Sequence, residues 1–212
     1  MHAAGEFRSY LFGFSDFAVC CSDDGVTGLR RNALNVAAFI WGLAEGTLFF
    51  FVPDVLLSLI GMQRGAKAAA IACGWAAVGA AAGGIIMFAW SVAAPEAAYA
   101  AVLAVPAVSA EMGAAAHRAM QDQGWFIATL QGPLSRTPYK LYAVIAPHVG
   151  APLWLFAVAS LIARLPRFLI VSLGCAAIAH WLGPRVSIQR LTWGLGLGWV
   201  LFYIAFFALT PG

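Results

Sequence analysis

The chain has 212 residues, with 12 Lys and Arg against 9 Asp and Glu; 62% of its residues are hydrophobic and only 10% are charged. Soluble domains carry about 25% charged and 45–50% apolar residues, so this chain could not cover a soluble surface with polar side chains. High hydrophobicity also excludes intrinsic disorder, and a net charge of only +3 argues against nucleic-acid binding. The composition therefore predicts an integral membrane protein of several helices.

The first 31 residues are predicted to form a separate N-terminal segment. Between 7 and 21, apolar residues recur at steps of three and four, which places them on one face of a helix. A short amphipathic helix lying flat in the membrane interface fits this pattern. The acids and glycines of 23–28 are expected to end it.

The next apolar stretch, 32–62, contains Glu45, Pro53 and Asp54, whereas 68–95 has no charged residue at all. At about 1.5 Å per residue, the second stretch easily crosses a hydrocarbon core of ~30 Å. It contains Gly79 and Gly83 at the spacing that allows a neighbouring helix to pack closely.

The middle of the chain is too interrupted for ordinary spans. We interpret 96–111 as a connector and 117–124 as a polar linker. Two apolar arms follow, 125–134 and 138–149, and each is about 15–18 Å long as a helix, or half a membrane. We expect them to form a broken hairpin.

Two further spans are predicted at 152–182 and 191–210. The membrane domain proper is expected over 32–183, with half-repeats at about 32–95 and 125–183. The remaining 184–212 is predicted to be a C-terminal transmembrane helix.

The basic residues at the ends of 32–62 favour a particular topology. Arg30 with Arg31 precedes the stretch and Arg64 with Lys67 follows it. Both pairs stay cytoplasmic if the stretch enters the membrane and returns at Pro53, as the positive-inside rule prefers.

The second broken stretch then enters from outside, and the chain becomes an inverted repeat of a re-entrant helical hairpin plus a transmembrane helix. The fold class predicted here is therefore all-α, polytopic and membrane-embedded. The alternative is a set of five or six ordinary crossings.

Six ionisable residues lie well inside the apolar stretches, where each costs about 2.5–3.5 kcal/mol at a helix centre. Six facing lipid would cost roughly 15–20 kcal/mol, more than the net stability of a typical protein. We therefore expect them to face one another or a wet cavity. They are Glu45, Asp54, Arg136, Lys140, Arg164 and Arg167.

Two acids against four bases leave surplus positive charge, which suits an anion. Arg136, Lys140 and Arg164 are the expected ligands of a phosphate, because Arg presents a planar fork of donors and Lys adds a point charge. The alternative is that the charged residues only lock helices together as ion pairs, or that Arg164 and Arg167 merely extend to the interface.

Glu45 and Asp54 have a second expected role. Burial raises the pKa of a carboxyl group and a nearby Arg lowers it, so such a group can couple proton uptake to substrate movement. His148, which follows Pro147 in the second hairpin, is a candidate proton relay.

No motif predicts covalent or metal chemistry. The histidines and the four cysteines lack metal-ligand spacing, and there is no HExxH, GxSxG, Walker or GxGxxG motif. We expect no metal, no cofactor and no enzymatic activity, and we interpret the cysteines as small buried hydrophobic residues.

Two segments resemble the DedA family, the bacterial group within the SNARE-associated or VTT-domain superfamily, and in particular its YqaA-like branch. The first runs from Trp41 to Leu57, where an acid is followed by a proline and a second acid. The second comprises 137–143 and 160–168, a Pro-Tyr-Lys segment followed by an arginine-containing helix. The run Arg136-Thr-Pro-Tyr-Lys140 is shorter than the family's R-x-x-P-x-x-R spacing and carries Lys in the second arginine position.

The resemblance covers about 33–183. It implies two opposed re-entrant loops, location in the bacterial inner membrane, and flipping or scrambling of phospholipids or polyprenyl phosphates, in some members linked to protons. The expected partners are lipid phosphates and protons, and a homo-oligomer is compatible with the sequence. The alternatives are a proton-coupled exporter of small solutes, a lipid-phosphate enzyme and a non-transporting assembly factor.

Overall fold

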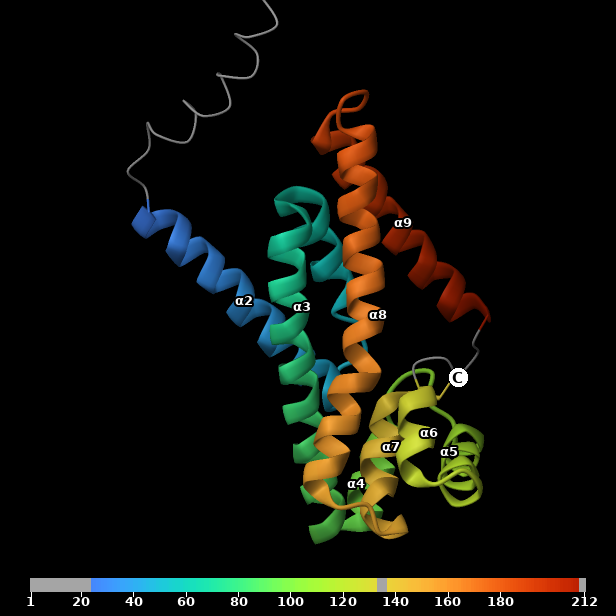
Figure 1. Ribbon diagram of the computed structural model, residues 1–212. Helices are drawn as coiled ribbons and strands as arrows, with labels where there is room; N and C mark the ends of the chain where they lie inside the picture. The colour runs from blue at the N-terminus through green and yellow to red at the C-terminus, as the bar shows by residue number, and fades with distance from the viewer. Residues whose placement is uncertain (1–23, 133–136, 210–212) are drawn as a thin grey trace, which may run out of the picture. The chain divides into compact units, whose positions relative to one another are not determined.

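The structure is a computed structural model that describes residues 24–132 and 137–209. Throughout these residues the regular elements are helices, as predicted (Figure 1). The predicted interfacial helix at 7–21 lies outside the described residues. The elements are α2 (Asp24–Gly46), α3 (Asp54–Ala93), α4 (Pro95–Leu103), α5 (Ala110–Asp122), α6 (Trp125–Gln131), α7 (Tyr139–Ile145), η2 (Ala146–Val149), α8 (Leu153–Leu182) and α9 (Ile188–Leu209).

Within the described ranges, α3, α8 and α9 are long and apolar enough to cross a membrane. They correspond to the spans predicted at 68–95, 152–182 and 191–210. The chain divides into two compact units between Leu34 and Asn35, and all the packing described below lies within the second.

Two interruptions shape the first half of this unit. The residues between α2 and α3 leave the helical conformation, and Pro53 immediately precedes α3, close to the turn that the sequence predicts. Gly65 then breaks α3 with φ 80° and ψ 178°, a conformation that residues with a Cβ rarely adopt. Figure 1 shows the chain reversing at both points.

Small residues bring α2 and α3 into direct backbone contact. A Cβ on Gly42 or Gly46 would overlap the main chain of α3, and one on Gly79 or Gly83 would overlap that of α2. The predicted close packing at the Gly79 and Gly83 pair is therefore present, and α2 is the neighbouring helix. Without a hydrophobic drive between helices in lipid, such close approach is a principal source of association.

The long helices α3 and α8 pack along each other, and the contact again uses a small residue. Gly61 lies against the main chain at Ser172, and the Ser172 hydroxyl lies 3.0 Å from Cys73 Sγ. Cys73 is fully buried, as expected of a small hydrophobic residue. By contrast, α9 has no buried residue.

Two helices, α5 and α2, differ from what the sequence predicts. Residues 117–122 belong to α5, so most of the expected polar linker is helical. Its buried face is made by Gly113, Ala116 and Met120, while the polar residues lie on the opposite face. Likewise, α2 begins at Asp24 and runs through the glycines that were expected to end a helix. The connector predicted at 96–111 holds α4 and the start of α5, neither of which is a candidate span.

The α2–α3 contact can be tested with one substitution at two glycines of α3. We expect Gly79→Ala to lower the free energy of unfolding by about 1–3 kcal/mol, because the added methyl group meets the backbone of α2. Gly74→Ala has open space and is expected to be neutral or stabilising, since Ala is the better helix former. Thermal unfolding in detergent measures both variants. Equal effects would contradict the close packing.

Candidate functional site

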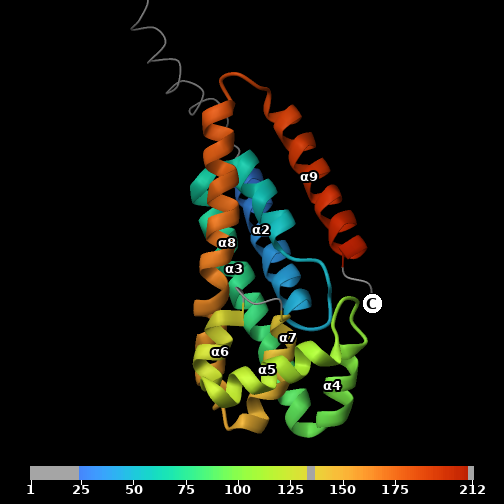
Figure 2. The same ribbon diagram turned by 90° about the vertical axis from the view of Figure 1, so that its right-hand side faces the viewer.

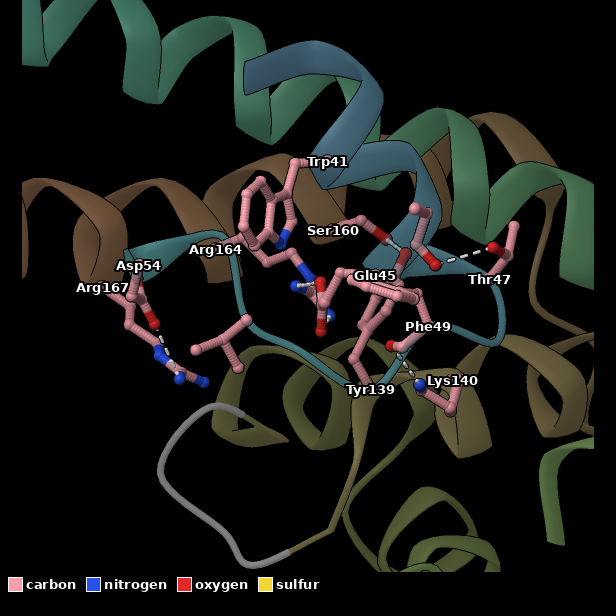
Figure 3. A network of polar contacts seen from close by, with 12 residues as sticks. Trp41, Glu45, Thr47, Phe49, Asp54, Tyr139, Lys140, Ser160, Arg164 and Arg167 are labelled. Atoms are coloured by element: carbon pink, nitrogen blue, oxygen red, sulfur yellow. Dashed lines mark hydrogen bonds and ion pairs between the residues drawn. The ribbon is translucent and has the colours of Figure 1, made fainter. Parts of the chain in front are cut away.

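The charged residues of the apolar stretches meet where the end of α2, the start of α3, the start of α7 and the middle of α8 come together (Figure 3). We call Glu45, Asp54, Lys140, Arg164 and Arg167 the charged cluster. The sequence predicts that these residues face one another, and the structure brings all five to one place.

The central contact is a two-pronged ion pair between α2 and α8. Arg164 donates from Nη1 to Oε2 of Glu45, and from Nη2 to Oε1 at 3.1 Å. The side chains are only 7% and 12% exposed. Paired donors aimed at two carboxylate oxygens form one of the stronger hydrogen-bonding arrangements available to proteins.

A second ion pair lies beside the first. Arg167 Nη2 donates to Oδ2 of Asp54 at 2.9 Å. Arg167 follows Arg164 by three residues on α8, so both lie on the same face of the helix. Asp54 opens α3, where the helix dipole favours a negative charge. The expectation that Arg167 only reaches the interface is incomplete: about half of its side chain is exposed, but its guanidinium holds a buried acid.

Lys140 binds a backbone carbonyl group and not a carboxylate. Its Nζ donates to the carbonyl oxygen of Phe49 at 3.0 Å, and the residue is only 5% exposed. The described cluster thus holds two acids and three cations. The surplus positive charge predicted from the sequence persists in the folded arrangement.

Tyr139 and Ser160 complete the site, and the sequence analysis did not single them out as site residues. The Arg164 guanidinium carbon lies 4.1 Å from the centre of the Tyr139 ring, a cation–π contact. The Tyr139 hydroxyl donates to Ser160 Oγ at 2.5 Å, and Ser160 donates to the Phe156 carbonyl. The one available signal was the position of Tyr139 next to Lys140.

Three backbone polar groups of the loop between α2 and α3 are bonded by side chains. Trp41 Nε1 donates to the Phe51 carbonyl at 3.1 Å, and the Val52 N–H donates to the Tyr203 hydroxyl of α9 at 3.1 Å. Together with the bond from Lys140, these contacts tie the loop to α2, α7 and α9. These three groups have protein partners and do not depend on water for their hydrogen bonds.

Two buried atoms of the charged cluster lack a partner within the described residues. They are Oδ1 of Asp54 and Nε of Arg164. Leaving such atoms unbonded costs free energy, so buried polar atoms nearly always have partners. Within the described residues, one acceptor and one donor beside the ion pairs therefore remain without a partner.

Two further site residues were predicted. Arg136 lies outside the described residues. His148 is on η2, eight residues beyond Lys140, where its Nε2 lies 2.9 Å from Ser91 Oγ. No group of three His, Cys, Asp or Glu that could hold a metal occurs between residues 24 and 132 or 137 and 209.

Comparisons with protein-family models, with curated proteins and with solved structures found no match. What the chain does must therefore follow from the chemistry of its own residues.

The role of Tyr139 can be separated into ring and hydroxyl. Tyr139→Phe keeps the ring under Arg164 and leaves Ser160 its bond to Phe156, so we expect a cost of about 1 kcal/mol in unfolding free energy. Tyr139→Leu also removes the cation–π contact and the stacking on Phe156, and is expected to cost about 2–4 kcal/mol. Thermal unfolding compares them; equal losses would show that the ring does not support Arg164.

Proposed function

We propose that this protein is a multi-pass membrane transporter of the DedA type that flips or scrambles a phosphate-bearing lipid, such as a phospholipid or polyprenyl phosphate, in the bacterial inner membrane. The observation that carries the proposal is the charged cluster. It is buried apart from Arg167, it is net positive among its described members, and within the described residues one donor and one acceptor have no partner. The charged cluster lies where α2 ends and where α3 and α7 begin.

The chemistry of the cluster suits a phosphate better than a neutral or cationic group. Within the described residues, the Nε–H of Arg164 has no partner beside the two nitrogens that bind Glu45, and the ammonium of Lys140 lies close by on the Phe49 carbonyl. A phosphate offers several acceptor oxygens and can replace the carboxylate on the same guanidinium. Arg136, which precedes α7, is proposed to add a second guanidinium group to the phosphate site.

The loop between α2 and α3 supports a location within the membrane. Leu48, Phe49 and Phe51 expose apolar side chains, while the backbone at Phe49, Phe51 and Val52 is bonded internally. Water-exposed loops show the opposite pattern. At membrane depth, irregular backbone is tolerated only where protein or a wet cavity satisfies it. We therefore propose that residues 32–62 form a re-entrant hairpin.

The second half is proposed to be the inverted counterpart of the first. Its short helices α6 and α7 lie on either side of Pro138 and are too short to span a membrane, and the long α8 follows them. In the first half, the broken segment 32–62 precedes the long part of α3. Broken helices that meet near the midplane build substrate sites in many transporters.

Glu45 is the proposed proton acceptor of the site. While Glu45 is ionised it occupies two nitrogens of Arg164, so a lipid phosphate must compete with it. Protonation removes the negative charge and weakens the pair, which frees the guanidinium for phosphate. Proton uptake and lipid binding would then favour each other, which links lipid movement to pH.

Reconstitution distinguishes lipid translocation from the other functions. Proteoliposomes containing the purified chain should exchange a fluorescent phosphate-bearing lipid between leaflets at least about 10-fold faster than protein-free vesicles, without passing a small soluble anion. Passage of soluble anions without lipid exchange would indicate a small-solute exporter. Exchange of neither would remove the transport proposal and favour an assembly factor.

A double-mutant cycle separates binding from helix locking. Glu45→Gln and Arg164→Gln each leave a buried charge unpaired, and each is expected to lower unfolding free energy by about 3–5 kcal/mol. The double variant removes both charges and should recover most of that stability. Lipid exchange should nevertheless stay at least about 10-fold below that of the unsubstituted protein in all three. Arg164→Gln and the double variant lack the phosphate ligand, and Glu45→Gln lacks the carboxylate that displaces the phosphate and lets it leave. Glu111→Gln and Arg190→Gln, at exposed positions, serve as controls.

The outcome of the double variant decides whether the pair takes part in phosphate binding or only locks the helices together. If lipid exchange returns together with stability, the pair only locks α2 to α8. Arg164→Lys gives a second check: it keeps the charge but not the fork, so partial activity is expected.

A further inference from the structure

A cavity of about 630 Å³ lies at the far end of α7 from Lys140. Figure 2 shows α4, α5 and α7 close together at one end of α3. Val144 and Ile145 of α7 and His148 of η2 form one side. The other sides come from the end of α3, from α4 and from α5. The remaining lining residues are Ser91, Pro95, Glu96, Tyr99, Gly113, Ala114, His117 and Arg118.

The polar groups of this cavity are mainly hydrogen-bond donors and cations. Arg118 and His117 are exposed neighbours on α5, and Glu96 is the one acid among the residues that line the cavity. Arg is permanently charged and only donates, and every His ring donates from at least one nitrogen. Because His117 and Arg118 adjoin on α5, their N–H groups together suit an anionic group.

Ser91 fixes the position of His148 at the edge of the cavity. The Ser91 hydroxyl donates to the Val144 carbonyl at 2.6 Å, and its oxygen lies 2.9 Å from His148 Nε2. Because the single hydroxyl hydrogen is used on the carbonyl, Nε2 supplies the hydrogen of the second bond. This arrangement orients the imidazole, and it does not activate Ser91 as a nucleophile, which would need Nε2 to accept.

The walls of the cavity are apolar. Pro95 and Tyr99 face it from α4, and buried Val144 and Ile145 face it from α7. Gly113 on α5 lets the Tyr99 hydroxyl approach the helix, because a Cβ there would overlap it. A concave site of several hundred Å³, with apolar walls and a few converging polar groups, is the usual form of a small-molecule site.

We propose that this cavity binds an amphiphilic anion, with its phosphate or similar head group against Arg118 and His117 and its apolar body against Tyr99, Val144 and Ile145. This site is separate from the charged cluster, and it stands whether or not the chain transports lipid. The bound molecule would contact the end of the short helix whose first turn carries Tyr139 and Lys140.

Photolabelling tests the site directly. The full chain in detergent is labelled with a lysophosphatidic acid that carries a photoreactive acyl chain. We expect saturable labelling within 91–99, 113–118 and 144–148. Unlabelled lysophosphatidic acid should compete at least about 10-fold better than a monoacylglycerol of the same chain length or than inorganic phosphate.

Each other result of the competition overturns the proposal. Equal competition by the monoacylglycerol would show that the charge is not recognised. Equal competition by inorganic phosphate would show a free-anion site. Labelling confined to other segments would place the ligand elsewhere, including in the charged cluster.

Matched variants locate the ligand within the cavity. Ala114→Trp fills the cavity, whereas Ala115→Trp places the same side chain on an exposed neighbour outside it. We expect saturable labelling to fall about 10-fold in the first and to stay within about 2-fold in the second. Arg118→Gln should weaken it about 10-fold, and Arg185→Gln, at an exposed position outside the cavity, should not. Unchanged labelling in Arg118→Gln or folded Ala114→Trp would contradict the proposal.

Discussion

The ion pair between Glu45 and Arg164 joins side chains 119 residues apart in a setting with little water. A charge buried in an apolar bundle is tolerated only with a partner, and removing one partner leaves the other uncompensated. The last turn of α2 must therefore reach the middle of α8. Tyr139 packs against the same guanidinium, so its position in the site depends on the same contact.

Bringing both acids to the arginines of α8 requires a break between α2 and α3. The chain leaves α2 directly after Glu45 and reaches Asp54 through a loop whose backbone is bonded by side chains from three helices. A straight helix would place Glu45 and Asp54, nine residues apart, on opposite faces. The break lets both acids face arginines on one face of α8.

Ion pairing alone does not account for the whole arrangement. A site built only to lock helices would be expected to match its charges and to bond its buried atoms. Here Lys140 binds a carbonyl oxygen, and among the described residues both Asp54 and Arg164 have an atom without a partner. These features cost stability, and such costs are commonly retained at functional sites.

The sequence predicted the three long apolar helices, because hydropathy reports directly on them, and its prolines indicated the break between α6 and α7. It also predicted that the inward charges would meet, since lipid leaves them no other option. It could not assign the pairs, because pairing depends on how α8 is rotated. Tyr139 was missed since an aromatic ring carries no charge signal. The polar run 117–124 was misinterpreted because Met120 is its only buried residue, and the rest of the buried face of α5, Gly113 and Ala116, is small.

The central claim is that a lipid phosphate binds Arg164. Solid-state NMR can measure it as magnetisation transfer between ¹⁵N-labelled guanidinium groups and the ³¹P of a phosphate lipid in reconstituted membranes. The difference between the unsubstituted protein and Arg164→Lys isolates the signal of this residue. We predict a nitrogen–phosphorus separation of roughly 4 Å, as a charge-assisted hydrogen bond to a phosphate oxygen requires. The absence of any Arg164-dependent transfer at saturating lipid would contradict the account.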